Sequence, residues 1–113
     1  MTTKLLNAAT ADIAAPTSVA DSNYAEIVGN QGALGVAVHV FGTWDGAQID
    51  LYTGFNGISN AVLIKSFTVP STPDDGDNFQ MLPIPGGTGV YAVLTGADAL
   101  TNLNLWIGGQ GSD

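Results

Sequence analysis

The chain has 113 residues and a formal charge of −8, with ten acidic residues, two lysines, no arginine and no cysteine. Because nucleic-acid binding depends on Lys and Arg side chains that neutralise phosphates, this charge predicts no nucleic-acid partner. The lack of cysteine excludes disulfides, thiolate metal ligands and thiol catalysis.

The hydropathy pattern predicts neither a membrane span nor an export signal. No apolar stretch approaches the roughly 20 residues that a membrane-spanning helix needs, so we expect no membrane partner. The first ten residues contain no apolar run of the kind that forms a signal peptide, so we expect synthesis in the cytoplasm.

The composition is that of one domain with a packed core and a weakly charged surface. Apolar residues make up 45% of the chain and charged residues only 11%, well below the usual share of about 25%. A chain of this length buries enough surface to fold without a disulfide or a metal. Uncharged polar residues and glycine must cover much of the exterior. Such a surface fits two alternatives equally, a protein that packs against other proteins and one that is alone in water.

Residues 1–22 are rich in alanine, threonine and serine and show no sustained helical or strand period. They predict a flexible or extended N-terminal arm that precedes a single β-domain over residues 23–113. Leu5, Leu6 and Ile13 are the apolar side chains by which such an arm would attach. Two interpretations stay open, a disordered arm or an arm ordered by a partner or a neighbouring subunit.

Short strand-like segments separated by turn residues fill the rest of the chain. Over residues 34–41 the aliphatic side chains take every second position, so that His39 and Phe41 fall on the opposite face. Residues 47–53 alternate in the same way and place Tyr52 away from the apolar side. We predict about seven short strands, at residues 24–28, 34–41, 47–53, 62–69, 79–84, 90–95 and 103–107. The pattern predicts an all-β fold, an antiparallel β-sandwich or a jelly-roll-like barrel.

Turn residues and prolines add local detail. Asp45-Gly46 is a strong hairpin signal because both residues tolerate a positive φ. Pro83 and Pro85 indicate that residues 79–84 form an edge strand, and Lys65 indicates an exposed position or a protected edge.

No group of residues predicts catalysis, so we expect no enzyme, no catalytic residues, no cofactor and no metal. His39 is the single histidine. Catalysis by His39 would need a nucleophile and an orienting carboxylate, and although the chain contains serine and aspartate residues, no sequence motif places them beside it. Asp74, Asp75 and Asp77 predict a solvated acidic loop. A weak calcium or magnesium site is the alternative, although no glutamate follows to complete a calcium loop.

The aromatic side chains are the best candidates for contacts with other molecules. Trp44 lies at a turn, and Trp106 and Tyr52 face away from the aliphatic side of their strands. Large aromatics outside a core are candidate interface anchors, unless a second sheet or the N-terminal arm covers them. The predicted interface residues are Leu5, Leu6, Ile13, His39, Phe41, Trp44, Tyr52 and Trp106.

Four segments carry a resemblance to a known class of proteins. They are VFGTWDGAQIDL at residues 40–51, LPIPGG at 82–87, VYAVLTGA at 90–97 and LNLWI at 103–107. In this order they resemble small bacteriophage virion proteins over roughly residues 34–107. The chain departs from that pattern at residues 53–58, where TGFNGI stands in place of a Pro-Asp-Gly-Gly hairpin.

The resemblance implies a β-sandwich virion component, most often a decoration or cement protein, commonly trimeric, on the capsid exterior. We therefore predict a non-enzymatic structural protein of a phage particle that stabilises the capsid by binding the major capsid protein and itself. The acidic charge agrees with a position outside the DNA-filled head. The alternative is an adhesin module of a tail, fibre or spike, in which surface tryptophans and tyrosines stack on a host glycan.

Overall fold

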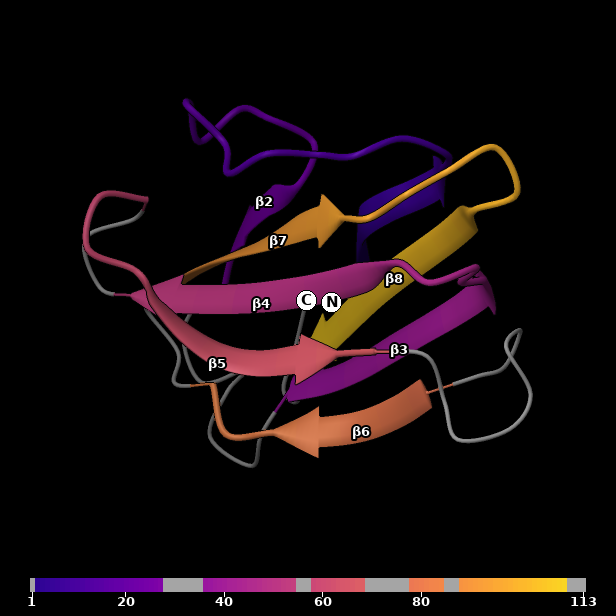
Figure 1. Cartoon of the computed structure of the whole chain (residues 1–113). Helices are drawn as coiled ribbons and strands as arrows, with labels where there is room; N and C mark the ends of the chain where they lie inside the picture. Colours follow the sequence, from indigo (N-terminus) through magenta and orange to yellow (C-terminus); the bar gives the residue numbers. More distant parts are fainter. Residues whose placement is uncertain (1, 28–35, 55–57, 69–77, 85–87, 110–113) are drawn as a thin grey trace.

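The protein is an all-β molecule in which two four-stranded sheets pack face to face (Figure 1). The computed structural model describes residues 2–27, 36–54, 58–68, 78–84 and 88–109. Its strands are β1 (Thr2–Ala9), β2 (Tyr24–Glu26), β3 (Val36–Thr43), β4 (Gln48–Gly54), β5 (Val62–Phe67), β6 (Asn78–Leu82), β7 (Gly89–Thr95) and β8 (Asn102–Gly109). Within these described parts no helix is long and apolar enough to cross a membrane.

The strand order is that of a jelly roll. Sheet A has the order β1-β8-β3-β6, sheet B has the order β2-β7-β4-β5, and every pairing is antiparallel. Each strand of the first half of the chain thus pairs with one of the second half, β1 with β8, β2 with β7, β3 with β6 and β4 with β5. Two sheets built from such pairs form the eight-strand jelly roll. The predicted antiparallel sandwich is confirmed, with eight strands instead of seven.

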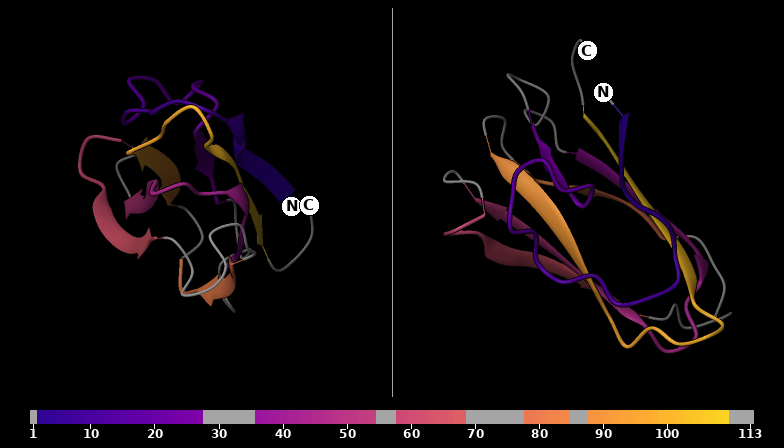
Figure 2. Two further views of the ribbon diagram at one scale, coloured as in Figure 1. Left: turned by 45° about the vertical axis from the view of Figure 1, so that its right-hand side comes forward. Right: turned by 90° about the horizontal axis from the view of Figure 1, so that it is seen from above.

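The core lies between the two sheets, which Figure 2 shows as two layers in its right-hand view. In β3 and β4 every second side chain is buried and its neighbours are partly exposed. This alternation is expected of antiparallel strands with one face on a core. The strand residues that fill the centre are Val36, Val38 and Val40 of β3, Ile49 and Leu51 of β4, Val90, Ala92 and Leu94 of β7, and Leu103, Leu105 and Ile107 of β8.

Residues 2–9 depart from the predicted N-terminal arm because they form β1, paired with β8 of the same chain. Leu5 and Leu6 are 2% and 1% exposed and belong to the core. The register shifts between Lys4 and Leu6, so two adjacent leucines point inward, as a β-bulge permits. This bulge removes the period-two pattern, which explains why the sequence did not predict the strand.

The segment after β1 runs along sheet B and extends it. Ile13 and Leu94 exchange two backbone hydrogen bonds of 3.0 and 2.9 Å. The buried Asn23 side chain donates from Nδ2 to the carbonyl oxygens of Ala14, at 3.0 Å, and Ala92, at 2.8 Å. Residues 10–23 therefore lie beside the part of β7 that the short strand β2 does not cover, since β2 pairs only with residues 89–91.

The Asp45-Gly46 turn is confirmed, but the predicted hairpin is wrong. The φ angles of Asp45 and Gly46 are 46° and 85°, which suits a tight turn with two left-handed residues. The two strands that the turn joins, β3 and β4, lie in different sheets and do not pair. Local turn chemistry fixes the reversal of the chain and leaves the partner of each strand open.

The two edge predictions agree with the sheet order. β6 is the edge strand of sheet A, next to β3, and β5 is the edge strand of sheet B, next to β4. Lys65 lies on the β5 edge, where a charged side chain discourages pairing with another chain.

The buried position of Leu6 predicts that β1 contributes to the stability of the whole domain. Leu6→Ala should lower the free energy of unfolding by about 2–5 kcal/mol, because it leaves a cavity in the core. Asn7→Ala, at the exposed neighbouring position, should change it by less than about 0.5 kcal/mol. Urea denaturation of both variants measures the difference, and equal midpoints would show that β1 is dispensable.

Candidate functional site

One row of side chains crosses the outer face of sheet A. Trp106 of β8 lies opposite Lys4 of β1 on one side and His39 of β3 on the other. His39 in turn lies opposite Phe79 of β6. The row faces away from the core because its neighbours along β3 and β8 point inward. Four strands from all parts of the chain thus contribute one side chain each to a continuous line.

Aromatic contacts join this row to its neighbours. The ring centroid of His39 lies 4.8 Å from that of Phe41 and 5.3 Å from that of Phe79, and Phe41 lies 6.5 Å from Trp106. Phe79 is 65% exposed and Met81, which lies opposite Ala37, is 48% exposed. We call His39, Phe41, Phe79, Met81 and Trp106 the aromatic face.

The aromatic face carries no negative charge of its own. None of the four strands of sheet A, all within the described residues, contains Asp or Glu. Lys4 on β1 supplies a positive charge, and its Nζ lies 4.9 Å from the centre of the Trp106 ring in a cation–π contact. Elsewhere Asp50 lies on β4, and Asp98 Oδ1 accepts a hydrogen bond from the Leu100 N–H at 2.9 Å.

The indole nitrogen of Trp106 is a polar atom inside this apolar surface. Nε1 is buried and has no hydrogen-bond acceptor among the described residues. A buried donor without an acceptor costs about 1–3 kcal/mol. The aromatic face therefore pairs an exposed apolar edge at Phe79 and Met81 with an unsatisfied donor at its centre.

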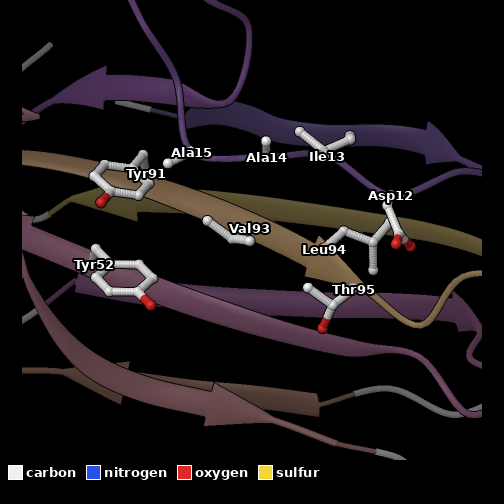
Figure 3. Close-up of a pocket in the computed structure, with 9 residues that line it drawn as sticks. All are labelled: Asp12, Ile13, Ala14, Ala15, Tyr52, Tyr91, Val93, Leu94 and Thr95. Carbon is white, nitrogen blue, oxygen red and sulfur yellow. The ribbon is translucent and has the colours of Figure 1, made fainter.

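A pocket of about 450 Å³ lies on the outer face of sheet B (Figure 3). Figure 3 shows Tyr52 and Tyr91 at one end, Asp12 and Thr95 at the other, and Val93 between them. The two tyrosine rings stack with centroids 5.0 Å apart and an interplanar angle of 15°. Asp12 Oδ1 accepts the N–H of Ala97 at 2.8 Å, which fixes the carboxylate at the rim.

The sheet holds the tyrosine pair in place. Tyr52 and Tyr91 lie directly opposite each other on the neighbouring strands β4 and β7. Tyr91 is only 7% exposed, and this burial, with a smaller contribution from Tyr52, raises the pKa of its hydroxyl above the ordinary value of 10.0. The phenol of Tyr91 therefore loses its proton at a more alkaline pH than an exposed tyrosine does.

The structure brings some of the predicted interface residues together and separates others. His39, Phe41 and Trp106 meet on the aromatic face, whereas Tyr52 lies on the opposite sheet in the pocket, which Ile13 also lines. Leu5, Leu6 and Trp44 lie in the core, so their side chains are not open to a partner. The alternative that the fold covers an aromatic side chain is confirmed for Trp44.

Phe79 and Met81 belong to the aromatic face but were missing from the predicted interface. Their signal was present, since residues 79 and 81 take alternate positions of a predicted edge strand. Only the pairing of Phe79 with His39 and of Met81 with Ala37 shows that these positions face outward.

Trp44 fills one end of the sandwich at the turn between the sheets. Its side chain is fully buried, and its backbone carbonyl accepts hydrogen bonds from the Ala47 N–H at 3.0 Å and the Thr101 hydroxyl at 3.2 Å. Its indole Nε1 has no acceptor among the described residues. The turn position therefore places Trp44 inward.

No metal cluster is found in the described ranges, where no three His, Asp or Glu side chains gather closely enough to hold an ion. The predicted acidic loop with Asp74, Asp75 and Asp77 lies outside the described residues. Its alternative role as a cation site therefore stays a prediction.

Comparison of the chain with protein-family models, characterised proteins and solved structures found no match.

The burial of Trp44 predicts very different costs for two substitutions. Trp44→Ala should lower the free energy of unfolding by about 3–5 kcal/mol. Trp44→Phe should cost less than about 2 kcal/mol, because a phenyl ring refills much of the cavity and the unsatisfied N–H is removed. Thermal or urea unfolding checks both values, and a Trp44→Phe variant as unstable as Trp44→Ala would show that the indole nitrogen has a partner.

The raised pKa of Tyr91 predicts a loss of stability in alkali. Because the pKa is higher in the folded state, the stabilisation is complete below the unfolded value of about 10 and falls as the pH rises through the folded pKa. Tyr91→Phe should flatten this decline in urea unfolding between about pH 8 and pH 11. Burial also raises the pKa of Tyr24, so part of the loss of stability with rising pH should remain in the Tyr91→Phe variant. Identical slopes for both proteins would contradict the assignment.

Proposed function

We propose that this protein is a non-enzymatic structural protein of a phage particle, which decorates and stabilises the outer surface of the capsid. In this proposal it binds the major capsid protein and associates with itself, as a trimer. The observation that carries the proposal is the aromatic face, an apolar, acid-free surface on an otherwise strongly acidic protein.

The make-up of the aromatic face supports a protein partner. The cores of protein interfaces are enriched in aromatic residues and Met and depleted of Asp and Glu. Phe79 and Met81 keep about half or more of their surface in solvent, at 65% and 48%. Full burial of such a side chain contributes about 1.5–3 kcal/mol, so each has about half or more of this free energy still to gain in a complex.

The distribution of charge supports a position on the exterior. A net charge of −8 opposes contact with packaged DNA, because no arginine and only two lysines can neutralise phosphates. The four strands of sheet A contain no acidic residue, so an acidic shell or a second acidic copy can approach this face without repulsion from the strands themselves. The jelly roll is also a fold that recurs in viral capsid domains.

The place of β1 changes how the contact is made. The predicted arm would have clamped a neighbouring subunit through Leu5 and Leu6, but both side chains fill this chain's own core. The proposed contact is therefore a rigid sheet face, which loses little conformational entropy when it binds.

The proposal predicts where the protein is found and which residue holds it there. Gradient-purified particles of the phage that encodes the chain should carry it in many copies, accessible to an antibody on intact heads. Phe79→Asp should abolish binding to the shell, because it places a charge in the contact. The matched control, Val19→Asp, changes a side chain that is 59% exposed outside sheet A and should bind normally.

Two results would contradict the proposal. Intact heads without the protein would refute the decoration function, and equal binding of Phe79→Asp and Val19→Asp would refute the aromatic face as the contact. A few copies per particle, at the tail, would favour the adhesin alternative instead.

A further inference from the structure

We propose that the pocket on sheet B binds a neutral sugar, as a mono- or disaccharide. This inference goes beyond the proposed decoration function and depends on a different surface. The pocket belongs to the outer face of β4 and β7, whereas the aromatic face belongs to sheet A.

The pocket has the size and the lining of a small-molecule site. Its volume of about 450 Å³ lies within the range of roughly 300–1,000 Å³ that such sites occupy. Small-molecule sites are mainly apolar and aromatic, with a few polar groups that orient the ligand. Here Tyr52, Tyr91 and Val93 supply the apolar part, and Asp12 and Thr95 supply the polar part (Figure 3).

This division matches the chemistry of a pyranose ring. A pyranose carries C–H groups on its faces and hydroxyls around its rim. The tyrosine end offers aromatic surface to the C–H groups, mainly from Tyr52, because Tyr91 is only 7% exposed. The other end offers hydrogen bonds to the hydroxyls. The carboxylate of Asp12 has about four lone-pair positions, of which the Ala97 N–H uses one. A hydrogen bond from a sugar hydroxyl to this charged acceptor is stronger than one to a neutral acceptor.

The charge around the pocket selects a neutral ligand over an anionic one. The residues described around the pocket include Asp12 and no Lys or Arg. The two lysines of the chain lie over other rings, Lys4 over Trp106 and Lys65 over Phe67. An acidic sugar would bring its carboxylate to a negative rim without a counter-charge, which disfavours binding.

The pocket is pre-formed by the fold. Tyr52 and Tyr91 stand on two hydrogen-bonded strands, and their stacking restricts both rings. The opposite wall, residues 12–15, is tied to β7 through the paired hydrogen bonds of Ile13 and Leu94. A site built on such fixed elements loses little entropy on binding.

A chemical-shift titration of the full-length protein tests the inference. The probes are the methyl glycosides of glucose, galactose and mannose, and N-acetylglucosamine. At least one should bind with a Kd of about 1–10 mM, typical of a small open site. Backbone amide signals of Ala14, Val93 and Thr95 should move, and those of Ala37 and Trp106 on sheet A should not.

Variants separate the role of each end of the pocket. Tyr52→Ala should weaken sugar binding at least about tenfold, whereas Tyr52→Phe should stay within about threefold because it keeps the ring. Asp12→Asn keeps an oxygen for the Ala97 N–H and should still weaken binding, because the charge is lost. Phe41→Ala, the loss of an aromatic ring on sheet A, is the matched control and should bind sugar normally.

The outcomes are distinct from those of the decoration test. Absence of shifts with every sugar, or shifts confined to sheet A, would overturn the sugar site. Equal binding of sialyllactose, or tighter binding of choline than of any sugar, would also overturn it in favour of a differently charged ligand. A Phe79→Asp variant that no longer binds the shell but still binds sugar would show that the two surfaces act independently.

Discussion

The structure depends on the burial of aliphatic side chains between the four central strands. β3 and β8 in sheet A, and β4 and β7 in sheet B, place Val, Leu, Ile and Ala at every second position against the opposite sheet. Because successive side chains of a strand point to opposite faces, this packing also decides what faces outward. His39, Phe41 and Trp106 stand on the exterior because their neighbours Val38, Val40 and Leu105 fill the interior.

The jelly-roll pairing then brings distant residues into line. Lys4 and Trp106 meet because the first strand pairs with the last, and Phe79 joins His39 because β6 pairs with β3. A shift of one residue in any of these pairings would move a whole strand's apolar set to the wrong face. Core burial therefore fixes the register, and the register assembles the aromatic face.

The two outer faces differ in their acidic residues. Sheet A presents aromatic side chains and one lysine, whereas sheet B presents a tyrosine pocket with Asp12 at its rim and, on β4, Asp50 bonded to Gln48 and Ser66. An acid-free apolar face suits a broad contact with another protein, and a pocket with one carboxylate suits a small neutral ligand. Under the two proposals made above, sheet A would hold the protein to a particle and sheet B would expose a sugar site.

The sequence by itself determined the fold class, seven of the eight strands, the turn at Asp45-Gly46 and the two edges, because these follow from local periodicity and turn chemistry. It also showed that four side chains point away from the aliphatic side of their strands, namely His39, Phe41, Tyr52 and Trp106. Only the tertiary structure decided that β1 belongs to the sheet, since a bulge hides its alternation. It alone buried Trp44 and sent Tyr52 and Trp106 to opposite faces. The reason is that strand pairing joins residues more than a hundred positions apart, such as Thr2 and Gly108, and no local pattern specifies which strands will pair.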